Sequence, residues 1–271
     1  MRSFSLGEQG PRVPILMYHR VVATGQGGNG PNIENPAYRL PLRMFREQMH
    51  LLREGGYPTL TLNRLLDFDA GPVRDQSVVI TLDDGWADNY ANALPVLAET
   101  GLKATLFVVT GFVGRKGYLT WQQLADMQAE GMSVQSHTHG HNPLSLLSEE
   151  EIRSELEVSK GSIEDRLGTP VDFLSAPHGM VDARVIRAAR SSGYRGICTS
   201  EPGFTHRYGA LTVFKRINIS SRFTPTRFQN VVKGNRTSIL TDVAMKKVRN
   251  LLKKSLGYKN YRKLYALRYG L

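Results

Sequence analysis

The sequence has very little cysteine and no long apolar run. Cys198 is the single cysteine among 271 residues, so no disulfide can form within the chain. Its setting in Gly196-Ile197-Cys198-Thr199 indicates a buried strand rather than a reactive thiol. No stretch approaches the roughly 20 apolar residues of a membrane-spanning helix, although hydrophobic residues make up an ordinary 41% of the chain. These features disfavour disulfide-built, membrane-spanning and disordered proteins.

An apolar leader is also missing. The segment from Met1 to Pro14 contains Gly, Glu, Gln and Pro where a secretory signal would carry an apolar run. We therefore expect a cytoplasmic protein, which could also lie at the periphery of a membrane. The length fits one principal domain with a small appendage.

Acidic residues are absent from the C-terminal end. From Ala244 to Leu271 the chain has nine Lys or Arg and no Asp or Glu, and the remainder carries only +2 of the net charge of +11. Apolar residues from 242 to 256 recur at helical spacing among the lysines, which predicts a basic amphipathic helix. Four tyrosines interleave with cations beyond it: Tyr258, Tyr261, Tyr265 and Tyr269.

Three roles are open for this tail over residues 242–271. It could dock on the main domain with a solvated basic face, lie on an anionic membrane surface, or contact an acidic polymer or partner. Nucleic acid is the rival partner because cations and aromatic rings suit phosphates and bases. We do not expect it, because it would leave the Asp and His clusters described below unexplained.

Short apolar runs alternate with stretches of helical period, which is typical of a parallel sheet or barrel built from βα units. Strands are expected near 13–18, 57–60, 77–82, 104–109, 132–136, 171–175, 195–199 and 212–217. Helices are expected over 42–55, 61–69, 88–100, 120–130, 148–167 and 182–192. Strands 77–82 and 104–109 are apolar on both faces, as interior parallel strands are. We predict a deformed parallel (β/α) barrel over residues 1–235 and a basic helical tail over 236–271.

A parallel barrel carries its chemistry at the carboxyl ends of its strands. Here these ends are followed by His19, Asp83 with Asp84, His137, and Pro177 with His178. The Gly-, Asn- and Pro-rich loop over residues 25–36 falls on the same face. Polar and titratable groups therefore collect at one end of the barrel.

Two of these clusters together indicate a metal site. Asp83 and Asp84 alone could belong to a solvated turn, and a lone histidine is more often structural. However, His137, His139 and His141 follow another strand of the same face. Imidazoles four residues apart can bind one ion when the backbone between them coils as a turn. The pairing of His137 and His141 with the Asp pair favours a divalent metal.

The same residues resemble the motifs of a known family. Thr81-Leu82-Asp83-Asp84-Gly85 and Ser136-His137-Thr138-His139-Gly140-His141 resemble two motifs of the NodB-homology polysaccharide deacetylases, carbohydrate esterase family four. Pro14-Ile15-Leu16-Met17-Tyr18-His19-Arg20-Val21 resembles the first strand of the circularly permuted branch that includes poly-N-acetylglucosamine deacetylases. The resemblance extends over roughly residues 13 to 220.

The resemblance implies a role for each matching residue. Asp84, His137 and His141 become ligands of one divalent metal, with zinc as first choice and cobalt, nickel or iron as alternatives. Asp83 becomes the base that activates water, and His19 the general acid. Alternatives for the acid are His178, His139, His206 or water. The pocket and oxyanion positions fall on His178, through its backbone amide, and on Pro177 and Trp86.

Two departures from the family pattern matter. Ser175 stands where much of the family has an Arg that orients the base, so the orientation of Asp83 has to come from elsewhere, or activity is weak. Asn142 separates His141 from Pro143, which we interpret as a small variation in the turn. His50 and His206 have no supporting cluster and are expected to be surface or structural residues.

The sequence thus predicts a metal-dependent hydrolase that removes N-acetyl, or more broadly N-acyl, groups from amino sugars of a polysaccharide or glycan precursor. The alternatives are an inactive carbohydrate-binding module on the same fold, or a basic protein that binds nucleic acid or a membrane surface. An inactive copy has no physical need to keep Asp83, Asp84, His137 and His141.

Overall fold

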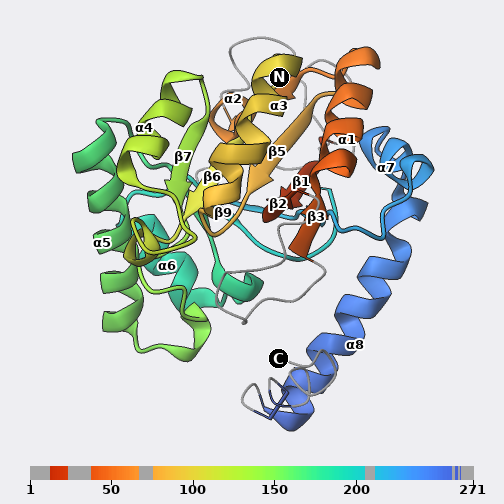
Figure 1. Ribbon diagram of the computed structural model, residues 1–271. Helices are drawn as coiled ribbons and strands as arrows, with labels where there is room; N and C mark the ends of the chain where they lie inside the picture. The colour runs from red at the N-terminus through yellow and green to blue at the C-terminus, as the bar shows by residue number, and fades with distance from the viewer. Residues whose placement is uncertain are drawn as a thin grey trace, which may run out of the picture.

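The computed structural model describes residues 13–23, 38–66, 76–204 and 211–257, together with Asn260, Tyr261 and Lys263. A curled parallel sheet occupies the centre and helices cover its outside, as Figure 1 shows. The predicted deformed barrel is confirmed. The loop over residues 25–36, the end of the helix expected over 61–69, His206 and most of the tail tyrosines lie outside the described residues.

The main sheet runs in the order β10-β9-β8-β7-β6-β5-β1-β11, with β4 also paired to β5, and the pairings are parallel. Its strands are β1 (Ile15–Tyr18), β4 (Thr59–Leu60), β5 (Val78–Leu82), β6 (Thr105–Val108), β7 (Ser133–Ser136), β8 (Phe173–Ser175), β9 (Gly196–Cys198), β10 (Thr212–Phe214) and β11 (Ile217–Asn218). β2 (Arg20–Val22) and β3 (Arg39–Pro41) form a separate pair.

The helices are α1 (Leu42–Glu54), α2 (Leu62–Leu66), α3 (Leu94–Thr100), α4 (Trp121–Ala129), α5 (Glu149–Leu167), α6 (Ala183–Ser191), α7 (Pro225–Val232) and α8 (Leu240–Leu256). Capping boxes begin α4 at Thr120 and α5 at Ser148, where sequence signals predicted them. None of the described helices is long and apolar enough to cross a membrane.

The strand predicted over residues 212–217 is not continuous. Residues 212–217 form two strands, β10 and β11, which are the two ends of the sheet path. The chain leaves β10 next to β9 and joins β1 as β11 through Lys215 and Arg216. This short connection brings the Arg216 side chain into the interior, where it is 2% exposed.

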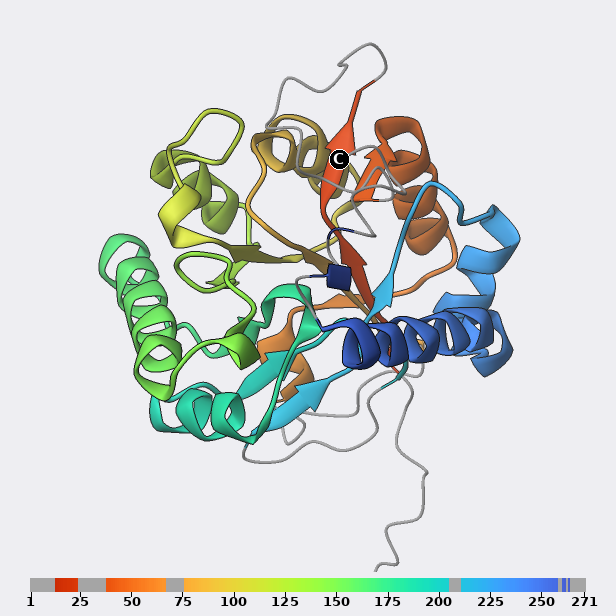
Figure 2. The same cartoon turned by 90° about the horizontal axis from the view of Figure 1, so that it is seen from below.

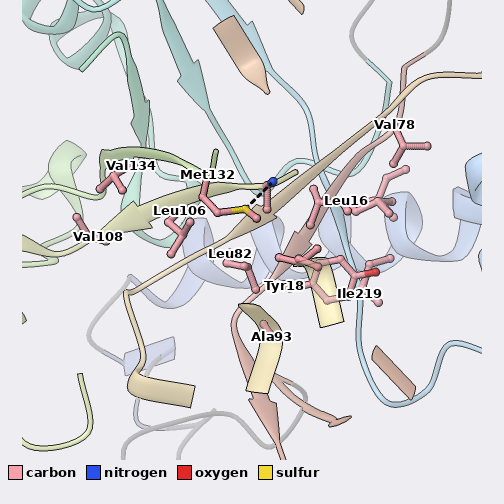
Figure 3. Packing of buried hydrophobic residues seen from close by; sticks show 14 of the residues in the cluster. Leu16, Tyr18, Val78, Leu82, Ala93, Leu106, Val108, Met132, Val134 and Ile219 are labelled. Carbon is pink, nitrogen blue, oxygen red and sulfur yellow. Dashed lines mark hydrogen bonds between the residues drawn. The ribbon is translucent and has the colours of Figure 1, made fainter. Parts of the chain in front are cut away.

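The alternation of side chains along each strand sorts the core into two clusters. Leu16, Val78 and Leu106 belong to the larger cluster, part of which Figure 3 shows. Ile15, Val79, Phe107, Phe173 and Phe214 belong to the smaller one. Alternate residues of a strand share a face. Ser175 and Arg216 lie two residues after Phe173 and Phe214, and Asp83 and His19 lie four residues after Val79 and Ile15, so these four residues continue the face of the smaller cluster. The smaller apolar cluster therefore lies directly beneath these four residues.

The helix expected over 88–100 begins as a π-helix, η3 (Asn89–Ala93), before it continues as α3. The Asn89 side chain is buried and donates a hydrogen bond to the His19 carbonyl at 2.8 Å. π-Helical turns often occur near functional sites. This one ties α3 to the strand that carries His19.

The tail helix α8 lies at the end of the barrel where the strands terminate, as Figures 1 and 2 show. Its apolar side chains are largely exposed: Leu240, Met245, Val248, Leu251, Leu252 and Leu256. The Lys246 side chain, by contrast, is only 13% exposed and contacts the loop after β9. The helix thus exposes an apolar stripe together with Lys247, while Lys246 contacts the body of the protein.

Candidate active site

Three potential metal ligands converge after β5 and β7. One ligand atom each from Asp84, His137 and His141 lies within 4.8 Å of the others. The Oδ1 atom of Asp84 is 3.2 Å from Nε2 of His137 and 3.3 Å from Nε2 of His141. Donors that share one ion at about 2.1 Å are separated by about 3.0–3.5 Å. The donor set therefore fits a single divalent ion, as the sequence predicts.

The His137 ring is oriented by the neighbouring strand. Its Nδ1 lies 2.7 Å from the Ser175 carbonyl, an acceptor only, so Nδ1 carries the proton and donates it. This leaves Nε2, the atom that faces Asp84, with a lone pair. Such a partner for the second ring nitrogen is common among metal-binding histidines.

The turn that presents His141 has an unusual backbone. Thr138 and His141 have φ angles of 66° and 61°, in the left-handed region. Glu155 of α5 holds this turn, because one of its carboxylate oxygens accepts hydrogen bonds from the His139 and Gly140 amides at 2.9 and 2.7 Å. Its other oxygen accepts one from Asn142. Glu155 was not predicted, since it lies 14 residues beyond His141 on a helix without a motif of its own.

Asp84 is held on both sides. It has a φ of 75°, and its second oxygen, Oδ2, accepts a hydrogen bond from Nε1 of Trp86 at 3.1 Å. Burial raises the pKa of Asp84, but the close imidazoles of His137 and His141 outweigh it and hold that pKa well below its ordinary value. Trp86 is 3% exposed and stacks on Tyr118. The structure thus places Trp86 against a predicted ligand, and its place in the substrate pocket stays a prediction.

The predicted base, Asp83, is paired with a residue that sequence reasoning missed. Arg216 donates to both Asp83 oxygens at 2.7 Å, and Ser175 donates to one of them at 3.1 Å. Arg216 also donates to Ser175 Oγ, Thr81 Oγ1 and the Thr199 carbonyl. Burial raises the pKa of Asp83, and Arg216 more than reverses this. The orientation expected to come from elsewhere thus comes from Arg216, and Ser175 belongs to the same network.

The predicted general acid, His19, is 9% exposed and directly follows β1. Its ring stacks on Tyr38 with centroids 4.0 Å apart, and among the described residues Nδ1 has no hydrogen-bond partner. Burial lowers the pKa of His19, and the charges of Asp84 and Asp83 oppose that shift. The imidazole therefore has an unused polar atom and lies within electrostatic reach of both carboxylates.

His178 lies beside a predicted ligand on another side of the site. Its exposed ring has its centroid 5.2 Å from that of His141, and its φ of 58° turns the backbone sharply after the buried Pro177. The two other described histidines make different contacts. His139 is exposed and contacts Thr110 at 3.0 Å, and His50 contacts Glu99 at 3.3 Å, consistent with a surface role.

Comparisons with known proteins agree with this geometry. A family model described as polysaccharide deacetylase matches residues 70–197. YxkH of Bacillus subtilis (strain 168), which carries the same family name, is 33% identical over 224 residues, 82% of this chain and 76% of YxkH. The poly-β-1,6-N-acetyl-D-glucosamine N-deacetylase of Staphylococcus epidermidis is 26% identical over 190 residues. That match covers 65% of this chain and 64%, less than two thirds, of the relative.

Solved structures show the same fold. The Streptococcus pyogenes deacetylase PplD, in complex with acetate, superposes with a TM-score of 0.74 at 25% identity, covering 83% of this chain and 99% of PplD. BC0361, a polysaccharide deacetylase from Bacillus cereus, gives 0.72 at 28% identity, covering 83% of this chain and 70% of BC0361. The enzyme class that the sequence predicts, a carbohydrate N-deacetylase, is confirmed. The chain belongs to the polysaccharide deacetylase family.

Proposed function

We propose that this protein hydrolyses the acetamido group of N-acetylated amino sugars in a polysaccharide or glycan precursor and requires a divalent metal. The observation that carries the proposal is the meeting of three metal-compatible donors with a separate, Arg-paired carboxylate, Asp83, at one end of the barrel. The relatives named poly-β-1,6-N-acetyl-D-glucosamine N-deacetylases support an N-acetylated glycan as the substrate.

Asp84, His137 and His141 would hold the ion. When bound there, a divalent ion lowers the pKa of a coordinated water and polarises the acyl carbonyl. Zinc suits two imidazoles and one carboxylate, and cobalt, nickel and iron suit the same donors. Trp86 and Ser175 contribute by fixing the orientation of Asp84 and His137.

Asp83 takes the proton from the attacking water. The guanidinium of Arg216 keeps this carboxylate ionised, and the two parallel hydrogen bonds fix its plane. A pre-oriented, ionised base contributes without reorganisation when the acyl carbon is attacked. Arg216 is a positioning residue, since its five described polar contacts are all to protein atoms.

His19 donates a proton to the amine as it leaves. A buried imidazole whose Nδ1 has no hydrogen-bond partner among the described residues suits this step, because a general acid needs a ring nitrogen left for the substrate. The His178 amide, displayed by a left-handed backbone next to His141, would donate to the developing oxyanion. We expect His19→Ala to lower kcat by about 10²–10⁴-fold.

The test is acetate release from N-acetylglucosamine oligomers by protein stripped of metal and then reloaded with each divalent ion. Asp84→Ala is compared with Asp165→Ala, which removes an exposed carboxylate of α5. Release that needs metal, persists in Asp165→Ala and is lost in Asp84→Ala supports the proposal. Metal and glycan binding without any release would instead favour an inactive carbohydrate-binding module.

We further propose that the outer face of α8 rests on an anionic membrane surface, with the protein in the cytoplasm and its substrate a lipid-linked or nucleotide-linked precursor. The exposed fractions of Leu251 and Val248 are 64% and 51%, and the exposed Lys247 borders this apolar stripe. An apolar stripe bordered by cations is typical of helices that lie in the membrane interface. The acidic residue of α8, Asp242, is paired with Arg227.

Flotation with phosphatidylglycerol vesicles tests this surface. We expect the double substitution Leu251→Ser and Leu252→Ser to abolish co-flotation, whereas Leu146→Ser, an exposed leucine outside α8, leaves it unchanged. Flotation that survives the double substitution contradicts the assignment of membrane binding to this stripe. Concentration-dependent self-association in its place would identify the stripe as a contact between two copies.

A further inference from the structure

The inner face of α8 meets the loop after β9, which is hydrogen-bonded to the turn that carries His178. Lys246 donates to Ser200 Oγ at 2.9 Å and lies 3.6 Å from Glu201, both in the segment after β9. Ser200 in turn donates to the His178 carbonyl at 3.2 Å. Lys246 is therefore two hydrogen bonds away from the residue that lies beside His141.

The same helix reaches the His19 side of the site. Burial raises the pKa of Tyr38, the ring stacked on His19, to about 12, and the charge of Arg249 opposes this rise. Arg249 thus lies within electrostatic reach of Tyr38. Further along, the Lys253 ammonium lies 5.4 Å from the centre of the Tyr261 ring, which is 8% exposed. Figure 2 shows α8 passing across this end of the barrel.

Lys246, Arg249 and Lys253 are close enough to influence one another. Their spacing of three, four and seven residues brings them to one side of a helix. Burial, followed by the charges of Lys246 and Arg249, lowers the pKa of Lys253 to about 8, and Glu201 opposes this. Burial lowers the pKa of Lys246 in the same way, again against Glu201. The Glu201 carboxylate offsets part of the repulsion that Lys246 and Lys253 experience, and a bound anion would relieve more of the repulsion within this cluster.

We propose that Lys246, Arg249 and Lys253 form an anion subsite beside the active site, and that the natural substrate is an acidic glycan with a phosphate ester or carboxylate near its N-acetylated sugar. This inference rests on the proposed deacetylase function. A glycan fits better than nucleic acid, because the subsite adjoins residues suited to amide hydrolysis: His178 is reached through Ser200 and Tyr38 faces His19.

The test compares a neutral β-1,4-linked N-acetylglucosamine oligomer, a hyaluronan oligomer with carboxylates, and a phosphodiester-linked N-acetylglucosamine oligomer. Binding to metal-loaded protein is measured by calorimetry at two salt concentrations, alongside acetate release. The double substitution Lys246→Gln and Arg249→Gln is matched with Lys247→Gln and Lys233→Gln, which removes two exposed charges outside this face. A DNA oligomer of equal charge serves as the competitor from another class.

We expect wild type to bind at least one acidic oligomer more tightly than the neutral one, with a preference that weakens in salt. The inner double substitution should weaken that binding about tenfold and leave the neutral oligomer and the control pair unaffected. The preferred oligomer identifies carboxylate or phosphate as the anion. Equal affinity for all three oligomers, equal losses in both double variants, or tighter binding of DNA overturns the subsite.

The two proposals fail separately. Acetate release from the neutral oligomer without any preference for acidic ones sustains the deacetylase and removes the subsite. Binding of acidic oligomers that depends on Lys246 and Arg249, without release from any oligomer, sustains the subsite and removes the deacetylase.

Discussion

The buried pair of Asp83 and Arg216 predicts a large and specific stability effect. Both side chains are nearly inaccessible, at 3% and 1% exposed, and Arg216 contributes hydrogen bonds to both carboxylate oxygens. Arg216→Met keeps an unbranched apolar stem but removes the guanidinium, which leaves the carboxylate buried without its counter-charge. Removing one partner of a buried pair costs about 3–5 kcal/mol. For a chain of this size each kcal/mol lowers Tm by about 2–4 °C.

The assay is urea unfolding of metal-free protein, with a double-mutant cycle. We expect Arg216→Met to lower the free energy of unfolding by about 3–5 kcal/mol. Adding Asp83→Asn should recover about half of this loss, because the neutral amide needs no counter-charge. Arg187→Met is the matched control, since its 65% exposed side chain pairs with Glu149 at the surface. Its cost should stay below about 1 kcal/mol.

Two results would refute this reasoning. If Arg216→Met costs no more than Arg187→Met, the pair is not desolvated as the structure shows. If Asp83→Asn fails to recover stability in the Arg216→Met background, the cost arises from packing rather than from the unpaired charge. Asp83→Asn alone should also be destabilising, because it leaves the Arg216 cation unpaired.

Three further predictions concern the supports of the site. Glu155→Ala should weaken metal binding about 10–100-fold, measured by competition with a chelator, because it removes the acceptor of the His139 and Gly140 amides. The exposed Glu157→Ala should leave the affinity unchanged. Equal affinities of the two variants would show that the turn keeps its conformation without Glu155. Trp86→Phe removes the donor to Asp84 and should weaken metal binding about tenfold with little loss of Tm; unchanged affinity would contradict that role. Gly179→Ala should lower kcat more than metal affinity, since φ is +67° and a Cβ would lie 2.6 Å from the Ser200 amide nitrogen. Full activity would show that this loop tolerates displacement.

The fold was accessible from sequence because local patterns and global architecture agree. Apolar runs such as Val78–Leu82 and the capping signals at Thr120 and Ser148 mark elements that the structure contains. The cluster of Asp84, His137 and His141 was accessible because Asp84 and His137 follow buried strands and His141 lies four residues beyond His137. At those positions the strand order itself fixes where side chains meet.

Arg216 and Glu155 were not accessible in the same way. Arg216 lies 133 residues from Asp83 along the chain, and its pairing depends on β11 crossing to β1. An arginine that follows Lys215 at the end of a short strand gives no spacing signal for such a contact. The orientation of α8 was also hidden, because helical periodicity separates two faces without saying which one contacts the body.

The most direct test of the central claim separates metal binding from proton transfer. Asp83→Asn and wild type are reloaded with the same divalent ion, and both metal content and acetate release from an N-acetylglucosamine oligomer are measured. We expect one ion per chain in both proteins and loss of release in Asp83→Asn, because Asp84, His137 and His141 would hold the ion while Asp83 takes the proton. Undiminished release by Asp83→Asn would contradict the account.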